Sequence, residues 1–195
     1  LLSNLGENLS TKGYVVFSIA HTDNTYTDFD PDISLMSAII NRTLDQRFMV
    51  TTVSALNEEG FLKGMLDPEK IGMIGYSFGG FGLLRTLGIK MNDGMIQRFS
   101  AYEDLITEAE DYQGDKRVKA AALFAPYGAA FFDMDTLANF TVPTLWLQGN
   151  ADTVVPHPPV YSEFQNAVNT DRYFVIYELL DHSIITNPVP PEVQD

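Results

Sequence analysis

One segment limits the possible folds of this 195-residue chain more than any other. It is the apolar run Ile71–Ile74 (IGMI), which leads directly into Gly75–Gly79 (GYSFG). The pentapeptide matches G-x-S-x-G, and the residues after it, 78–87, have the spacing of a helix. A buried strand, a glycine turn and a helix in this order predict a sharp strand-to-helix turn that exposes Ser77 at its tip.

Other apolar runs of strand length alternate with stretches of helical spacing. Residues 14–20 form a continuous run rich in β-branched side chains, which is typical of a strand covered on both faces. The remaining predicted elements are strands at 118–124, 143–147 and 173–177 and helices at 33–57 and 160–168. This alternation predicts an α/β fold, a mostly parallel sheet with helices on both faces.

The length of the chain is that of one domain, so we expect residues 1–195 to form a single unit. Residues 89–118 differ from the rest because Asp93-Gly94 interrupts the apolar pattern and acidic side chains then follow closely. We interpret this stretch as a solvated, acidic helical excursion from the domain.

Charge and composition exclude several classes of partner and chemistry. The formal net charge is −14, so nucleic acids and anionic lipids are poor partners. The chain has no cysteine, which excludes disulfides, thiolate metal sites and a cysteine nucleophile. No apolar run reaches the length of a membrane span, so we expect no stable membrane insertion. No signal peptide is visible at the start, and the compartment stays open.

A serine nucleophile needs a general base, and the base needs a carboxylate that orients it. After a G-x-S-x-G turn, the expected chain order is serine, acid, histidine. His21 precedes Ser77 and is out of order, and His157 lies on a Pro-rich loop. His182 follows the last predicted strand and is therefore the preferred base.

The acid has more candidates than the base. Asp152 directly follows the strand at 143–147, where a carboxylate at the carboxyl edge of the sheet is required, so it is preferred. Asp133 and Asp135 lie farther from their strand, and Asp181 is adjacent to the histidine in sequence. These three remain alternatives.

Other residues complete the predicted site. The backbone N–H of Phe78 begins the helix after the turn and would face the developing oxyanion. Tyr76 flanks the nucleophile and is a candidate for the substrate pocket. Trp146 is a second candidate, although an aromatic residue inside a parallel strand is more often part of the core. His21 and Asp23 are too few ligands for a metal site. Chemistry based on a serine, an acid and a histidine needs neither a metal nor an organic cofactor, so we expect neither.

With these residues in place, the chain resembles the α/β-hydrolases. More narrowly, it resembles predicted dienelactone hydrolases and plasma-type platelet-activating-factor acetylhydrolases, with cutinase-like polyester hydrolases as near neighbours. The resemblance implies that Ser77, Asp152 and His182 are nucleophile, acid and base. The matching stretches cover most of the chain in family order, and they are Lys12–Tyr26, Leu66–Gly80, Asp115–Tyr127, Val142–Pro156 and Asp181–Pro190.

The chain departs from this family pattern in two ways. Dienelactone hydrolase proper has a cysteine nucleophile, so the resemblance implies a serine esterase and not necessarily lactone opening. The family also carries a strand and an H-G-type loop upstream of residue 1, whose N–H is the other oxyanion donor. We therefore expect further sequence before Leu1 and a chain that lacks N-terminal strands of the fold. The alternative is that the strands at 14–20 and 71–74 pair directly and that the site has the Phe78 N–H as its one oxyanion donor.

The function expected from this pattern is hydrolysis of small-molecule or lipid-like carboxylic esters through an acyl-enzyme on Ser77. Two alternatives stay open. One is a catalytically silent hydrolase-fold module that binds or scaffolds, and the other is a cutinase-like polyester hydrolase. Acyl and alcohol specificity and oligomeric state do not follow from the sequence.

Overall fold

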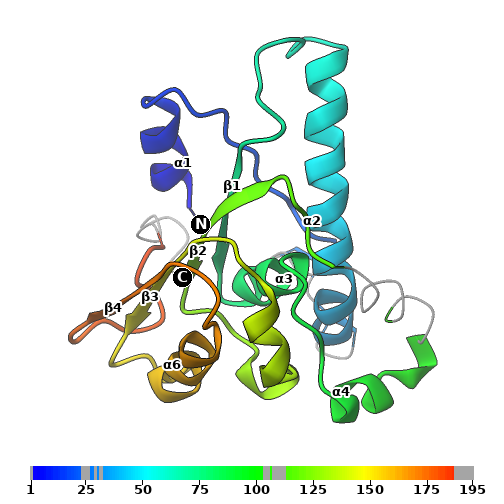
Figure 1. Cartoon of the computed structure of the whole chain (residues 1–195). Helices are drawn as coiled ribbons and strands as arrows, with labels where there is room; N and C mark the ends of the chain where they lie inside the picture. The colour runs from blue at the N-terminus through cyan, green and yellow to red at the C-terminus, as the bar shows by residue number, and fades with distance from the viewer. Residues whose placement is uncertain are drawn as a thin grey trace.

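A computed structural model of the chain describes residues 2–22, 27–28, 30, 33–102, 106 and 113–186. The fold consists of one parallel sheet with helices packed against it (Figure 1). Within these ranges, none of the helices is both long enough and apolar enough to cross a bilayer.

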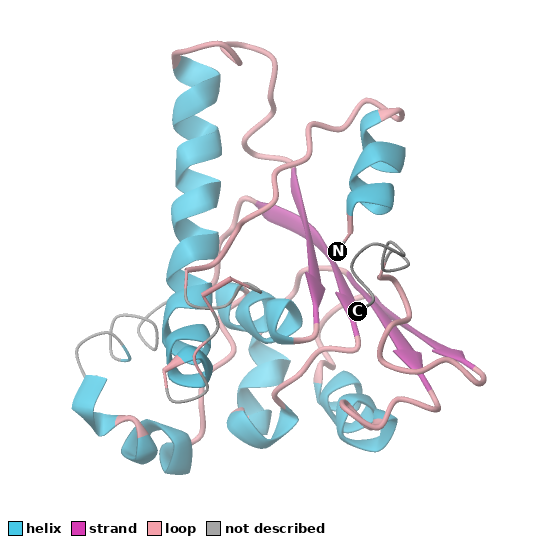
Figure 2. Ribbon diagram, turned by 180° about the vertical axis from the view of Figure 1, so that it is seen from behind, coloured by secondary structure: helices cyan, strands magenta, loops and turns pink. Residues whose placement is uncertain are grey.

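In the described part of the chain, the sheet has four strands in the order β1-β2-β3-β4, and every neighbouring pair is parallel. The strands are β1 (Ile71–Tyr76), β2 (Val118–Phe124), β3 (Thr144–Gly149) and β4 (Arg172–Tyr177). Each lies where the apolar runs predict a strand. Because all four run in one direction, their carboxyl ends meet at one edge of the sheet (Figure 2).

Helices connect the strands and pack beside them. The longest is α2 (Ser34–Glu58), which packs along α3 (Phe78–Thr86), and α3 in turn contacts β1 and β2. The helix α6 (His157–Asn166) joins β3 to β4. The shorter helices are α1 (Ser3–Ser10), α4 (Asp93–Arg98), η1 (Ser100–Tyr102), η2 (Ala129–Phe131) and η3 (Met134–Asn139). The predictions of helices at 33–57, 78–87 and 160–168 are confirmed, with small shifts at their ends.

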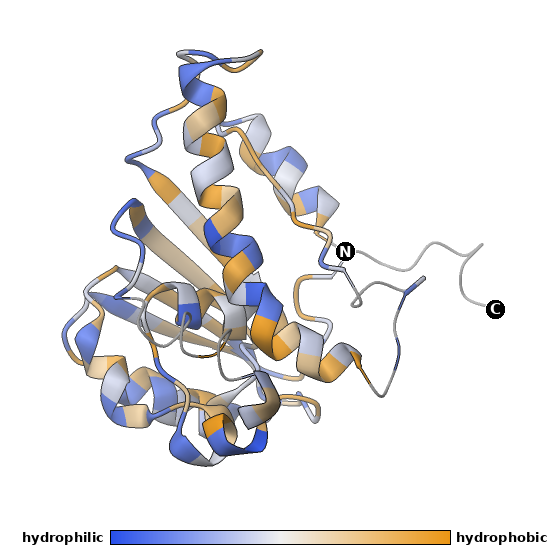
Figure 3. Ribbon diagram, turned by 90° about the vertical axis from the view of Figure 1, so that its right-hand side faces the viewer, coloured by the Kyte–Doolittle hydropathy of each residue, from blue (hydrophilic) through white to orange (hydrophobic). Residues whose placement is uncertain are grey.

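The core lies on one face of the sheet, between the strands and the helices α3 and α6. Leu123 and Trp146 are neighbours across β2 and β3, and both are fully buried with Phe81 of α3. Phe164 of α6 packs its ring against Trp146. Figure 3 shows the strands mostly in hydrophobic shades, as a sheet that packs on helices requires.

The prediction of helices on both faces is wrong for the described part of the chain. The face opposite α3 carries the row Ile74, Ala122, Leu145 and Tyr173, whose members are neighbours in register across all four strands. Tyr173 is 68% exposed, and Ile74 and Leu145 are also exposed. The apolar runs therefore predicted these four strands correctly but did not predict how completely each face of the sheet is covered.

The prediction of a strand at residues 14–20 is also wrong. This segment leads from α1 towards α2 and belongs to no strand of the sheet (Figure 1). Its first four apolar side chains, Tyr14, Val15, Val16 and Phe17, are exposed, with Tyr14 at 63%. A run of β-branched residues favours an extended backbone, but a strand also needs a partner that supplies hydrogen bonds.

The stretch 89–118 is only partly the solvated excursion that its composition suggests. Met95 and Phe99, in and after α4, belong to the core. Asp115 is buried and forms an ion pair with Arg117 at 2.7 Å. The remaining acidic residues of the cluster, Glu103, Asp104, Glu108, Glu110 and Asp111, lie outside the described residues.

Candidate active site

Ser77 lies at a tight turn between β1 and α3, and its backbone is strained. Its φ is 52° and its ψ −122°, a conformation that non-glycine residues rarely adopt. The turn is possible because two glycines leave room for close backbone approaches. A Cβ on Gly75 would lie 2.6 Å from the carbonyl oxygen of Gly79, and one on Gly80 would lie 2.6 Å from the Cβ of Pro126.

Backbone hydrogen bonds hold the strained serine in place. Its N–H donates to the carbonyl oxygen of Phe124 at 3.0 Å, and its own carbonyl accepts from the N–H of Tyr127 at 3.0 Å. Phe78 is the first residue of α3, so its N–H has no acceptor inside the helix. The positive end of the helix dipole therefore lies beside the Ser77 hydroxyl, where an oxyanion would form.

Asp152 lies on the turn after β3 with its side chain completely buried. Its Oδ1 accepts hydrogen bonds from the backbone N–H groups of Val154 (2.9 Å) and Val155 (2.7 Å). Its Oδ2 accepts from the Gln148 side-chain amide at 3.2 Å. These donors hold the carboxylate in place and fix which of its oxygens faces the neighbouring histidine.

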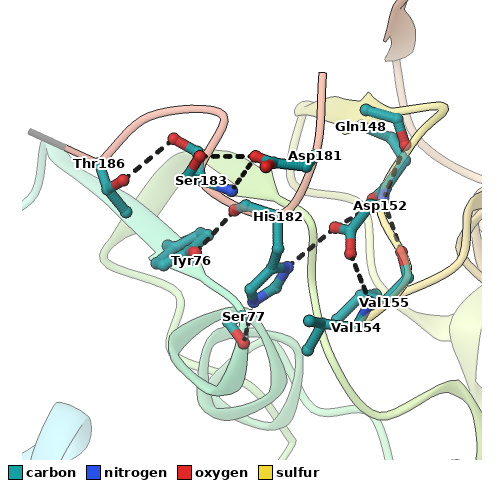
Figure 4. Close-up of polar contacts among 11 residues, drawn as sticks. Tyr76, Ser77, Gln148, Asp152, Val154, Val155, Asp181, His182, Ser183 and Thr186 are labelled. Carbon is teal, nitrogen blue, oxygen red and sulfur yellow. Dashed lines mark hydrogen bonds and ion pairs between the residues drawn. The ribbon is translucent and has the colours of Figure 1, made fainter. Parts of the chain in front are cut away.

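His182 joins this carboxylate to the serine (Figure 4). Its Nδ1 lies 2.8 Å from Asp152 Oδ2, and its Nε2 lies 3.0 Å from Ser77 Oγ. The imidazole is 20% exposed, so one side of it faces the solvent. The expected convergence of Ser77, Asp152 and His182 at the carboxyl edge of the sheet is confirmed.

The direction of these hydrogen bonds determines what the arrangement can do chemically. Asp152 accepts at Oδ2, so the Nδ1–H of His182 donates to it and Nε2 carries the free lone pair. Nε2 can then accept the Ser77 hydroxyl proton as the oxygen attacks an electrophilic carbon. The buried carboxylate stabilises the imidazolium that results. These are the hydrogen bonds that a serine nucleophile, a histidine base and an orienting acid would require.

The other candidate residues lie elsewhere or have other partners. Asp181 Oδ1 accepts from the N–H and the hydroxyl of Ser183, and Asp133 Oδ1 accepts from the N–H of Asp135. His157 is the first residue of α6. Among the acid candidates, Asp152 is the one that the structure places within hydrogen-bond distance of His182.

His21 forms a separate pair with Asp45 of α2, with Nδ1 and Oδ2 2.6 Å apart. Burial lowers the pKa of His21, although the hydrogen bond to Asp45 opposes this effect. The suggested partner Asp23 lies outside the described residues. Within the described ranges, His, Asp and Glu side chains do not gather in groups of three or more that could hold a metal ion.

The two residues predicted for the substrate pocket have different surroundings. Trp146 is fully buried and donates its indole N–H to Thr144 Oγ1 at 2.9 Å. It belongs to the core, as expected for an aromatic residue inside a parallel strand. Tyr76 is half-buried beside His182, and a role in the pocket remains a prediction. Phe78 packs its ring 4.5 Å from that of Tyr127, so aromatic side chains line the start of α3.

Sequence reasoning missed Gln148, which is fully buried near the end of β3. Its amide donates both to Asp152 Oδ2 and to the carbonyl oxygen of Val155, at 2.7 Å for the second. It therefore holds the two ends of the turn that carries the acid. A polar side chain in an otherwise apolar run, four residues before the candidate acid, was the available signal.

No model of a known protein family matches the chain, and no curated protein is significantly similar to it. The class that is established is therefore an α/β domain with an all-parallel sheet. Function is therefore inferred from the geometry at the carboxyl edge of that sheet.

Proposed function

We propose that the chain is a serine hydrolase of carboxylic esters with an α/β-hydrolase fold. The observation that carries the proposal is the hydrogen-bond chain from Ser77 Oγ through His182 to the buried Asp152, at 3.0 and 2.8 Å. The strained backbone of Ser77 supports it, since strain of this kind at an exposed nucleophile is typical of the G-x-S-x-G turn.

In the proposed reaction, Ser77 Oγ attacks the ester carbonyl carbon while His182 Nε2 takes its proton. The Phe78 N–H stabilises the negative charge on the carbonyl oxygen. The alkoxide then leaves as the alcohol, with the proton from His182, and an acyl group remains on Ser77. Water, activated by His182, hydrolyses this acyl-enzyme and regenerates the serine.

The test combines labelling of the serine with ester turnover. A fluorophosphonate probe should modify Ser77 of the folded chain, and p-nitrophenyl esters of short and medium acyl length should be hydrolysed. Ser77→Ala should lose the label and reduce turnover by about 10⁶-fold, while its thermal unfolding matches that of the unchanged protein. An unlabelled Ser77 in the folded protein, without ester turnover, would instead favour a silent binding or scaffold module.

A further inference from the structure

Tyr76 links the strand of the nucleophile to the loop of the histidine. Its hydroxyl donates a hydrogen bond to the backbone carbonyl oxygen of His182 at 2.7 Å. Its ring lies beside the imidazole, with centroids 5.0 Å apart and planes inclined by 32° (Figure 4). One side chain therefore contacts both the backbone and the ring of the candidate base.

The position of Tyr76 on β1 explains how it can reach this loop. Side chains alternate along a strand, and Gly75 faces α3, so Tyr76 lies on the opposite face of the sheet. It is also the residue directly before Ser77. Any displacement of Tyr76 relative to Ser77 is therefore limited by the backbone of a single strand.

The other end of the histidine loop is held by the turn of the acid. The N–H of Leu179 donates to Asn150 Oδ1 at 2.7 Å, and the N–H of Ala151 donates to the carbonyl oxygen of Leu180 at 3.0 Å. These bonds place the loop relative to Asp152. The Tyr76 bond is different, because it places His182 relative to the strand that carries the nucleophile.

We propose that Tyr76 is a positioning residue, whose hydroxyl and ring hold His182 Nε2 at hydrogen-bond distance from Ser77 Oγ. The inference rests on the proposed esterase function and deepens it. Proton transfer depends steeply on this distance, and a displacement of about 1 Å in an active site can reduce the rate by about 10²-fold. Tyr76 does not touch the reacting atoms and acts through His182.

The first measurement compares Tyr76→Phe, which removes only the hydroxyl, with the unchanged protein. We expect kcat for p-nitrophenyl esters and the fluorophosphonate labelling rate to fall about 10- to 100-fold, with KM changed less than twofold. Tyr161→Phe is the matched control because it makes the same change on α6, away from the triad. It should leave kcat and labelling unchanged.

Two further variants keep the test decisive if Tyr76→Phe fails to fold. Tyr76→His keeps an aromatic ring, although its shorter side chain no longer reaches the His182 carbonyl oxygen, whereas Tyr76→Leu has no ring. We expect Tyr76→His to retain more activity than Tyr76→Leu at equal thermal stability. Equal kcat in the two folded variants would overturn the proposal, as would a folded Tyr76→Phe chain with the kcat of the unchanged protein.

A spectroscopic measurement separates this proposal from the proposed function. The proton shared by His182 Nδ1 and Asp152 should give a downfield ¹H NMR signal in the unchanged protein, and this signal should broaden or shift in Tyr76→Phe. If the unchanged protein hydrolyses no ester, the esterase proposal fails, and the signal still tests the positioning of His182. A signal identical in both chains would overturn the positioning role.

Discussion

The backbone carbonyl of Leu180 lies against Gly149, in the space that the Cβ of any other residue would occupy. Gly149 ends β3 and precedes the turn of Asp152, while Leu180 precedes His182 by two residues. The turn of the acid and the loop of the histidine therefore pack backbone against backbone. This contact limits how closely the turn of Asp152 and the loop of His182 can approach each other.

Gly149→Ala should therefore damage the site more than the fold. The added methyl group must push Leu180 outwards, which we expect to destabilise the protein by about 1–3 kcal/mol and to lengthen the contact between His182 and Asp152. Fluorophosphonate labelling of Ser77 should slow at least tenfold. Gly72→Ala is the control, because a Cβ at Gly72 would meet nothing within 4 Å. Equal labelling rates in the two variants would contradict this account.

Asp152→Asn should reduce kcat by about 10⁴-fold, because a neutral amide neither selects the Nδ1–H tautomer of His182 nor stabilises its cation. Steady-state ester kinetics measure the effect, and circular dichroism checks the fold. Asp135→Asn changes an exposed carboxyl on η3 and should leave kcat unchanged. If Asp152→Asn left kcat nearly unchanged, Asp133 or Asp135 would be the better candidate for the acid.

Gly75→Ala should destabilise the strand-to-helix turn itself. The new Cβ would meet the backbone of Gly79 and Gly80, and backbone cannot move aside as a side chain can. We expect the free energy of unfolding in urea to fall by about 1–3 kcal/mol relative to Gly72→Ala on the same strand. A Gly75→Ala chain as stable as Gly72→Ala would show that the turn relaxes without cost.

Glu163 of α6 is fully buried, and neither of its carboxylate oxygens has a hydrogen-bond partner among the residues that the structure describes. Burial raises its pKa well above the ordinary value of 4.5. The folded chain therefore keeps a proton that the unfolded chain releases. The contribution of Glu163 to stability is fully present below pH 4.5 and is lost as the pH rises through the raised pKa of the folded state.

Glu163→Gln should remove this pH dependence, because an amide does not ionise. Above pH 4.5, the unfolding free energy of the variant should gain on that of the unchanged protein, by up to about 1.4 kcal/mol per pH unit. Urea denaturation at several pH values between 5 and 9 measures the difference. The control is Glu178→Gln, which changes an exposed carboxyl. Parallel stability curves for the Glu163→Gln and unchanged chains would contradict the prediction.

Local pattern was sufficient to predict four strands and the principal helices. The runs at 71–74 and 118–124 are short, apolar and bounded by turn residues, so their own composition favours a buried strand. The order of Ser77, Asp152 and His182 was also readable, because in a parallel sheet residues that follow strands gather at one edge. The type of each element and the order of these residues depend on neighbours in sequence, so they can be predicted from the sequence alone.

Only the tertiary structure decided which segments find partners. Residues 14–20 have the composition of a strand, yet pairing depends on a neighbouring strand that no local pattern describes. Two contacts set the geometry of the site. One joins Tyr76 to His182, which lie far apart in the chain. The other joins Asp152 to Gln148, a polar residue within an apolar strand. Sequence determined the chemical groups and the elements that carry them, and packing determined the distances between those groups.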